Sequence, residues 1–536
     1  MSEPGRAVNV VVDGLAHLGP LSYLVPEHLT VSPGDAVEVP VGKRVTSGLV
    51  IGPGNTAKAT RELLGRYGER TTQVDLDAAT LVATEQATQI QQLVARMAPR
   101  SGKGATPALV GEKLQTVQLP DLSEKHHTDP KQWLLLLHEP TIRPEDVAVT
   151  EAGRFSENGQ VLILCPTTAM VERVLARVTS GIVRLDSKAA RGEWAAFREG
   201  QAPVGVGTRA AAWYAPEKLS SIIVVDEEHP GHREQTAPRH HARDVALARA
   251  KALNVPLILT SRNPSPSAIG SGVKVYPVTP QNMPGWPEMR IHDETQDTVA
   301  THDLPYIIKA ELEEEATTTT PLVVVSGRST RRCMGCFTER NQPTSTNDRC
   351  PECGDLATRV LGYDKDRITE LFNGKVTPVL PHELDKHTDA GLVVITDLTV
   401  MLSRPELDPY QKAVGAILGA AGAAGPDGKV IAVVRDATHP VLKILFDLKD
   451  QLGIAKRSYR TAQRLNLPPF GKLVHLQLQQ KKLPDMTGWP GYVHGPSPVK
   501  GGWEFIIRCT PQDLPQVKRE VIKLRKRKVK FRYHID

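Results

Sequence analysis

The sequence predicts an α/β protein of several domains, two of which are parallel-sheet lobes. Its 536 residues exceed one hydrophobic core, and at about 100–200 residues per domain they make about three or four domains. Short apolar runs alternate with helical stretches, which is typical of parallel strands buried on both faces. The runs of the first lobe are residues 133–137, 161–166, 204–208, 221–229 and 256–261, and those of the second are 321–327, 391–397 and 429–436.

A small β-rich module is expected before these lobes. Residues 7–52 form short apolar runs separated by turns at Ser32-Pro33-Gly34 and Val41-Gly42-Lys43. A helix is expected over residues 81–98 and a polar linker over residues 99–130. The apolar face of that helix consists of Ile90, Leu93, Val94 and Met97.

The last hundred residues have an α+β pattern followed by a basic helix. We therefore expect four units: residues 1–115, 116–275, 276–425 and 426–536, with an insertion in the third at about 328–360. Basic residues are concentrated at the end of the chain. They form either a solvated helix face or a surface that contacts DNA phosphates, and both interpretations are open. They are Lys518, Arg519, Lys523, Arg525, Lys526, Arg527, Lys528, Lys530 and Arg532.

Charge and hydropathy exclude some classes of protein. The net charge of +6 and the pI near 8.9 permit a nucleic-acid partner, although an ordinary basic enzyme fits equally well. No apolar run approaches the ~18 residues that a membrane span needs, and the N-terminal residues lack the pattern of a signal peptide. We expect a cytoplasmic protein with no membrane partner.

Four of the six cysteines have the spacing of a metal site. Cys333, Cys336, Cys350 and Cys353 form C-x2-C-x13-C-x2-C, in which each pair turns two sulfurs toward one point. Four thiolates in a tetrahedron suit one zinc ion. An iron–sulfur cluster and four unrelated thiols are the alternatives. Cys165 and Cys509 lie in strand-like runs and are expected to be core thiols.

An acidic motif ends one strand of the first lobe. The run Ile222–Val225 is followed by Asp226, Glu227, Glu228 and His229. In nucleic-acid motors of superfamily two, the aspartate of such a motif orients magnesium and the next glutamate activates water against the γ-phosphate. A solvated strand end is the plain alternative.

The phosphate-binding loop that such a motor needs is missing. The loop G-x4-G-K-[ST] should follow residues 133–137, but residues 138–146 contain neither glycine nor lysine. They contain two prolines, which have no amide donor, and three acids, which we expect to repel phosphate. Gly102-Lys103 lies in the linker and lacks the following hydroxyl residue. Residues 416–425, where the facing lobe should supply arginines, contain none.

Several stretches together resemble the primosomal protein N′ (PriA) family of replication-restart helicases. They are GTRAAAW (207–213), SSIIVVDEEH…HHARD (220–244), LILTSRNPS (257–265), YLVPEHL…VEVPVGKRVTSGLVIG (23–52), RCMGC…CPECG (332–354) and LNLPPFGKLVHLQL (465–478). The resemblance implies a 3′-end-binding N-terminal module, two RecA-like lobes with a zinc-ribbon insertion, and an α+β C-terminal domain.

Departures from the family pattern qualify this implication. The family usually has eight zinc cysteines, whereas this chain has four in the C-x2-C pairs. Residues 416–425 replace the family's arginine-bearing Q-x-x-G-R-A-G-R stretch. Ser22 stands where the family has an aspartate for the 3′-terminal nucleotide. We interpret the chain as a shortened, motif-degenerate member. Asp226 and Glu227 would then be vestigial, and no other catalytic or nucleotide-binding residue is assigned.

The leading functional prediction is a replication-restart protein without ATP-driven unwinding. It would bind forked, single-stranded or 3′-end-containing DNA and support primosome assembly with helicase-loading partners. Its expected cofactor is one zinc ion, while ATP with magnesium is not expected. The alternatives are an active 3′-to-5′ helicase with a divergent nucleotide site and a zinc-ribbon scaffold with no DNA role.

Overall fold

The structure is a computed structural model. It describes residues 6–69, 71–85, 90, 93, 113–120, 122–123, 133–189, 191–213, 216, 218–235, 240–281, 284–297, 304–325, 330–333, 335–336, 339–340, 349–350, 352–355, 358–396, 398–403, 409–435, 437–438, 442, 450–480, 482–483, 485–499, 501–526 and 529–535. Within these residues, no helix combines the length and the apolar character needed to cross a lipid bilayer.

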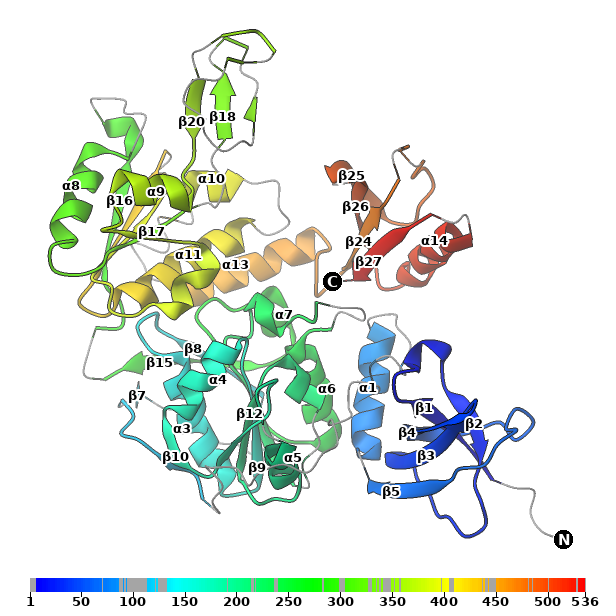
Figure 1. Cartoon of the computed structure of the whole chain (residues 1–536). Helices are drawn as coiled ribbons and strands as arrows, with labels where there is room; N and C mark the ends of the chain where they lie inside the picture. Colours follow the sequence, from blue (N-terminus) through cyan, green and yellow to red (C-terminus); the bar gives the residue numbers. More distant parts are fainter. Residues whose placement is uncertain are drawn as a thin grey trace.

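The N-terminal module is a five-stranded antiparallel sheet with strand order β2-β1-β4-β3-β5 (Figure 1). Its strands are β1 (Ala7–Val12), β2 (Leu21–Leu24), β3 (Asp35–Val41), β4 (Arg44–Pro53) and β5 (Gly65–Glu69). Valines alternate along β1 and β3 and, with Val50 of β4, fill its core. Helix α1 (Gln73–Glu85) then packs against α6 (Ala242–Leu253) of the first lobe. A buried ion pair of 2.6 Å between Asp75 and Arg249 fixes this contact.

The first lobe is a mostly parallel sheet with strand order β11-β12-β9-β13-β14-β8-β15-β7. Apolar strands such as β9 (QVLIL) are buried on both faces, as the continuous apolar runs predict. Its strands are β7 (Leu122–Ser123), β8 (Trp133–His138), β9 (Gln160–Leu164), β11 (Ile182–Arg184), β12 (Val204–Gly207), β13 (Leu219–Val224), β14 (Leu257–Ser261) and β15 (Lys274–Pro280). Its other helices are α3 (Pro144–Ser156), α4 (Thr168–Leu175), α5 (Arg191–Arg198) and α7 (Pro266–Gly270). A short pair, β6 (Gln115–Thr116) and β10 (Val178–Ser180), lies beside it.

The second lobe is a fully parallel five-stranded sheet with strand order β16-β23-β22-β17-β21. Its strands are β16 (Glu288–Asp293), β17 (Leu322–Val324), β21 (Thr377–Val379), β22 (Leu392–Ile395) and β23 (Lys429–Val434). Its helices are α8 (Tyr306–Glu315), α9 (Lys365–Leu371), α10 (Leu398–Ser403) and α11 (Pro409–Ala424). A separate small sheet of β18 (Thr330–Cys333), β19 (Glu339–Arg340) and β20 (Thr358–Leu361) projects from this lobe (Figure 1).

The C-terminal domain is an antiparallel sheet with strand order β25-β26-β24-β27, covered by α14. Its elements are β24 (Lys472–Leu478), β25 (Tyr492–Val499), β26 (Gly502–Cys509), α14 (Leu514–Lys526) and β27 (Phe531–Ile535). Helix α13 (Gln451–Arg464) precedes this domain and packs against α7 of the first lobe. The predicted fold class is confirmed: a β-rich module, two parallel-sheet lobes, a cysteine-bearing insertion and an α+β end.

Several limits expected from the sequence are wrong. Helix α1 begins at Gln73, eight residues before the expected helix, because the buried faces of Leu76, Ala79 and Val82 continue the apolar pattern upstream. The boundary expected after residue 275 cuts β15, which pairs with β8 of the first lobe. The boundary expected after residue 425 excludes β23, which pairs with β22 of the second lobe.

The basic end of the chain is also not one continuous helix. Lys530 precedes β27 and Arg532 lies in it, so these two residues are separated from the cations of α14. Arg527, Lys528, the Gly102-Lys103 pair and most of the predicted linker lie outside the described residues. The four domain limits as a whole remain a prediction.

Candidate functional site

The acidic motif lies where the sequence expects it, at the carboxyl end of β13. β13 lies between β9 and β14 in the middle of the first lobe, so the residues after it emerge at the edge that faces the second lobe. Asp226 has a φ of +48°, a left-handed conformation that a non-glycine residue adopts at a cost of roughly 1–3 kcal/mol. Such backbone strain favours a position that the surrounding contacts define tightly.

Glu227 is fully occupied by groups of the protein itself. Its side chain is fully buried. Oε1 accepts a hydrogen bond of 2.7 Å from the amide of Ser265, and Oε2 accepts bonds from Arg243 Nη1 at 2.7 Å and from Ser265 Oγ at 2.9 Å. Ser265 is the N-cap of α7, so the carboxylate joins β13, α6 and α7. Both oxygens of Glu227 therefore accept hydrogen bonds from side-chain or backbone groups of the protein.

Asp226 lies close to an imidazole and a guanidinium group. Its Oδ1 is 3.5 Å from His138 Nε2 and its Oδ2 is 3.8 Å from Arg262 Nη2. Burial raises the pKa of Asp226, but the proximity of His138 and the charge of Arg262 outweigh burial and hold the pKa below its usual range. His138 Nε2 and Asp226 Oδ1 have no hydrogen-bond partner within the part of the chain that is described.

Glu228 behaves differently from its two neighbours. Burial, and then the charges of Asp226 and Glu227, raise its pKa well above the usual range. Ser261 Oγ donates a hydrogen bond of 2.7 Å to its Oε2. The three acids therefore have three distinct environments.

The loop after β8 occupies the position of a phosphate-binding loop but offers few amide donors. Four of its amides donate to backbone carbonyl oxygens at 3.0 to 3.5 Å, and Pro140 and Pro144 have no amide hydrogen. The donors are Glu139, Thr141, Ile142 and Asp146, and their acceptors are Val278, Gly285, Glu139 and Arg143. A phosphate group placed here would find most of the donors already used.

The expectation that the three acids of this loop repel phosphate is wrong for two of them. The acids Glu145 and Asp146 do not face the cleft as bare charges, because two arginines of the first lobe pair with them. Asp146 pairs with Arg177 at 2.5 Å, and Glu145 lies 3.5 Å from Arg173. These two acids are therefore countered by arginines, and their repulsion of phosphate is weaker than the sequence alone suggests.

The second lobe closes directly onto this loop. Helix α11 contains the small-residue stretch 416–425 and approaches so closely that a Cβ on Gly422 would lie 2.4 Å from Arg262 Nη1 and 2.8 Å from the carbonyl oxygen of Pro140. Asn263 Nδ2 donates a hydrogen bond of 3.0 Å to the carbonyl oxygen of Gln411 in the same helix. The small residues thus allow helix backbone to pack where arginines of a motor would point.

Further contacts tie the lobes together on either side of α11. Gln451, at the start of α13, donates to the carbonyl oxygens of His138 at 3.1 Å and Arg262 at 2.9 Å. Arg173 donates to the carbonyl oxygen of Asp385 at 2.7 Å. The cleft between the lobes is thus lined by mutually bonded protein groups.

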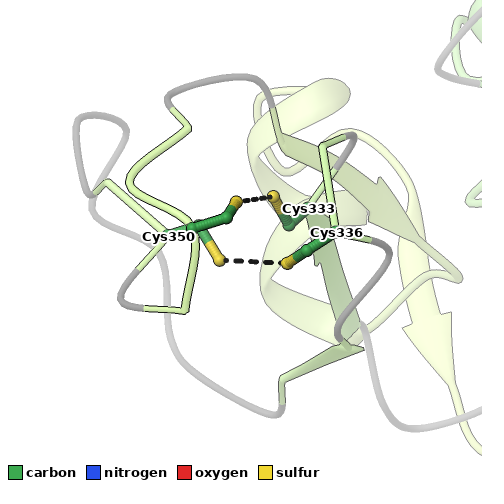
Figure 2. A group of neighbouring side chains, drawn as sticks. Cys333, Cys336 and Cys350 are labelled. Carbon is green, nitrogen blue, oxygen red and sulfur yellow. Dashed lines mark hydrogen bonds between the residues drawn. The ribbon is translucent and has the colours of Figure 1, made fainter.

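The four predicted cysteine ligands are brought together in the insertion. The distances are 3.4 Å between the sulfurs of Cys333 and Cys353 and 3.6 Å between those of Cys336 and Cys350, and all four sulfurs lie within 4.8 Å of one another (Figure 2). A tetrahedral zinc ion with Zn–S bonds of about 2.3 Å separates sulfurs by about 3.8 Å. The thiols are free, and disulfide bonds of about 2.05 Å do not fit these separations.

The turns that aim these sulfurs follow from local sequence. Gly354 adopts a φ of +77° directly after Cys353, and its amide donates to the carbonyl oxygen of Cys350 at 2.6 Å. A Cβ on Gly335 would approach Asp355 Oδ2 to 2.6 Å, so a larger residue in the other turn would have to displace the Asp355 side chain. Cys165 and Cys509 are buried in the cores, as predicted.

Ser22 belongs to a neutral polar cluster on the N-terminal sheet. Its hydroxyl donates to Asn9 Oδ1 at 2.8 Å and accepts from the amide of Asn55 at 3.2 Å. Asn9 in turn donates to the carbonyl oxygen of Pro53 at 2.8 Å. The cluster is therefore satisfied without a carboxylate at position 22.

Sequence reasoning missed the groups that close the cleft. Arg243 and Ser265 stood in recognised motifs, but nothing indicated that they would bind Glu227. Arg262 stands in the stretch LILTSRNPS (257–265), where nothing indicated its contact with Asp226, and Gln451 gave no signal. A buried acid requires a partner, so the neighbouring arginines could have been considered as candidates.

The comparisons with known proteins begin with the N-terminal module. Residues 9–97 match the model of the PriA 3′ DNA-binding domain. Similar curated proteins include replication restart protein PriA of Haemophilus influenzae, 32% identical over 120 residues, which are 21% of this chain and 16% of the relative. Replication restart protein PriA of Rickettsia felis is 25% identical over 335 residues, 56% of this chain and 50% of the relative. The chain thus spans about half or less of these two relatives.

Solved structures give a weaker likeness. Mss116p bound to single-stranded RNA and AMP-PNP has a TM-score of 0.33 at 10% identity, covering 60% of this chain and 70% of that one. Helicase Lhr of Mycobacterium smegmatis, bound to single-stranded DNA and AMP-PNP, has a TM-score of 0.31 at 11% identity, covering 62% and 46%. Such scores carry no argument about function. The sequence matches confirm the predicted similarity to PriA proteins, over residues 9–97 for the family model and over up to 56% of this chain for the relatives named.

Proposed function

We propose that this protein binds forked or 3′-end-containing DNA and supports replication restart without ATP-driven unwinding. In this role it would act in the cytoplasm and help partner proteins to reload the replicative helicase. The whole chain, rather than the N-terminal module alone, would present the DNA to those partners.

The DNA-binding part rests on the N-terminal match and on charge. The matched family domain is named for 3′ DNA binding, and its residues 9–97 cover the five-stranded sheet except Ala7 and Val8 at the start of β1. A basic net charge of +6 favours association with a phosphate backbone. Ser22 in place of an acid suggests weak discrimination of the terminal 3′ hydroxyl.

The non-motor part rests on one observation: both oxygens of Glu227 are bound by Arg243 and Ser265. Phosphoryl transfer needs a water-orienting group, a magnesium ion and donors to the phosphates. Here the candidate water-orienting group, Glu227, is bound by Arg243 and Ser265. Helix α11 packs on the loop that would supply the donors to the phosphates. The active-helicase alternative requires both arrangements to open together.

We further propose that the four cysteines hold one zinc ion. The support is the sulfur geometry and the two knuckle turns at Gly335 and Gly354. With no open coordination position among four thiolates, the ion would be structural and would stabilise the insertion.

A fork-binding experiment tests this function. Affinity is measured for two DNAs, a fork with an exposed 3′ end and the same fork with a double-stranded end. Each measurement is made with and without ATP. We expect preferential binding to the first fork and no effect of ATP. Failure to bind any fork would favour the zinc-ribbon scaffold alternative, and a large ATP effect would favour the helicase alternative.

A further inference from the structure

We propose that Cys353 is an oxidation site, at which hydrogen peroxide starts the conversion of the cysteine cluster into disulfides and releases its metal. This reaction rests on the proposed zinc site and goes beyond it, because it changes the ligands covalently. Two features of the cluster support it: the unequal exposure of the four cysteines, and the close approach of particular pairs of sulfurs.

The four thiols are not equally accessible. Cys333 and Cys350 are buried, Cys336 is partly buried, and Cys353 is exposed. The backbone explains this difference. Cys333 ends strand β18, which pairs with β20, whereas Cys353 precedes Gly354 in a turn where that glycine has a φ of +77°. A peroxide dissolved in water therefore meets Cys353 before the other three sulfurs.

Metal binding prepares the sulfurs of the cluster for oxidation. A thiol that coordinates zinc is held as a thiolate, and the thiolate is the form that a peroxide attacks. The two core thiols lack this activation, because burial raises the pKa of Cys165 and raises the pKa of Cys509 to about 11. Oxidation is therefore expected at the cluster and not in the cores, although all six cysteines are free.

A second thiol lies within reach of Cys353. The sulfurs of Cys333 and Cys353 are 3.4 Å apart, so a shortening of about 1.4 Å gives a disulfide of about 2.05 Å (Figure 2). The sulfurs of Cys336 and Cys350 are 3.6 Å apart. Both close pairs join one knuckle of the cluster, residues 333–336, to the other, residues 350–353. Disulfides between these pairs would hold the knuckles together in place of the ion.

The reaction balances with hydrogen peroxide as the two-electron oxidant. The Cys353 thiolate attacks one oxygen of the peroxide, which gives a sulfenic acid at Cys353 and releases hydroxide. The Cys333 thiolate then attacks the sulfenic sulfur, forms the disulfide and displaces a second hydroxide. Two thiolates are oxidised and one peroxide is reduced, and the zinc ion leaves because only two of its four ligands remain. A second peroxide converts Cys336 and Cys350 in the same way.

The second lobe does not depend on these thiols for its fold. The insertion that carries them lies between β17 and α9. Within the described residues, the two apolar clusters of the second lobe include none of the four cysteines. Loss of the metal should therefore change the insertion and leave the lobe folded.

The test treats the full, zinc-loaded chain with hydrogen peroxide and follows the free metal with a colorimetric chelator. We expect about one equivalent of zinc per chain to be released, and a thiol reductant with added zinc to reverse the loss. Mass spectrometry of peptides should find Cys333 bonded to Cys353 first, and Cys336 bonded to Cys350 at higher peroxide. Both core thiols should remain unmodified.

Two matched variants separate the exposed thiol from the metal. Histidine also coordinates zinc, so Cys353→His and Cys336→His should each keep the ion in a site of three cysteines and one histidine. Zinc release from Cys353→His should be at least about ten-fold slower than from the native chain, because its exposed ligand is not a thiol. Cys336→His keeps both Cys333 and Cys353, and it should release zinc at close to the native rate.

The outcomes distinguish this reaction from the zinc site itself. A native chain without zinc would overturn both. The oxidation site alone is overturned if the zinc-loaded chain keeps its ion in peroxide, if disulfides form within each knuckle instead of between the knuckles, or if the two histidine variants release zinc equally fast. If a histidine variant does not bind zinc, the disulfides found in the native chain decide the question. Fork binding by the reduced chain tests the proposed function separately.

Discussion

The acidic cluster after β13 and the cysteine cluster of the insertion both bring possible metal ligands together, but they differ in what those ligands contact. Glu227 has donors on both oxygens, supplied by Arg243 and Ser265. The four sulfurs of the insertion face mainly one another. Four thiols brought within 4.8 Å have little reason to converge without an ion, whereas an acid held by an arginine already has its countercharge.

This difference supports the proposal that the acidic motif is retained for structural reasons. The strand that carries Asp226 and Glu227 still needs its acids, because removing either would leave a buried arginine or histidine without its partner. The motif can therefore persist for structural reasons. The cysteines have no comparable role in a packed core, so their arrangement indicates a ligand.

The largest expected effect concerns the cysteine cluster. We expect about one zinc equivalent per native chain and almost none in Cys350→Ser, because zinc ribbons take most of their folding free energy from the metal. Metal analysis and limited proteolysis of the insertion measure this. Cys509→Ser, which changes a core thiol, should keep its zinc. A native chain with no metal, or with iron–sulfur absorbance, would contradict the zinc assignment.

The next effect concerns the acidic cluster. Arg243→Ala should lower the free energy of unfolding by about 3–5 kcal/mol, because it leaves Glu227 buried without its cation. Thermal melting measures the change. The matched control is Arg435→Ala, because Arg435 also pairs with a glutamate, Glu294, at 2.8 Å, but at the protein surface. Arg435→Ala should lower the free energy of unfolding by less than about 1 kcal/mol. Equal effects of the two variants would refute the structural role of Glu227.

A smaller effect tests the closed cleft. Alanine normally stabilises a helix by about 1 kcal/mol relative to glycine. Gly153→Ala in α3 should follow that rule, since a Cβ there meets no atom within 4 Å. Gly422→Ala should instead destabilise by about 1–3 kcal/mol, because its Cβ would clash with Arg262 and Pro140. Stabilisation by both substitutions would mean that the lobes are not packed together in solution.

The smallest effect concerns the basic end of the chain. Leu514, Val517 and Val521 of α14 are buried, which leaves Arg519 and Lys523 exposed. If these residues contact DNA phosphates, a triple variant should make the slope of log affinity against log salt for fork binding shallower by about two to three units. The variant combines Arg519→Ala, Lys523→Ala and Lys530→Ala. An unchanged slope would identify these residues as a solvated surface.

The sequence predicted those parts of the molecule that local pattern determines. Apolar runs located β8, β9, β12, β13 and β14 of the first lobe and β17, β22 and β23 of the second. The C-x2-C spacing located four sulfurs that do meet. What could not be predicted depends on contacts between distant segments. The pairing of Glu227 with Arg243, of Glu145 with Arg173 and the packing of Gly422 on Pro140 require the relative positions of strands and lobes. The boundary errors at β15 and β23 have the same cause, since sheet membership depends on pairing.

DNA-stimulated ATP hydrolysis is the most direct test of the central claim that this cleft does not work as a motor. We expect negligible turnover by the native chain on forked DNA, no shift of the melting temperature with ATP, and unchanged DNA affinity in Glu227→Gln. The reason is that Glu227 is bound by Arg243 and Ser265 and that α11 covers the phosphate loop. A turnover above ~1 per second, within the ordinary enzyme range, that Glu227→Gln abolishes would contradict the account.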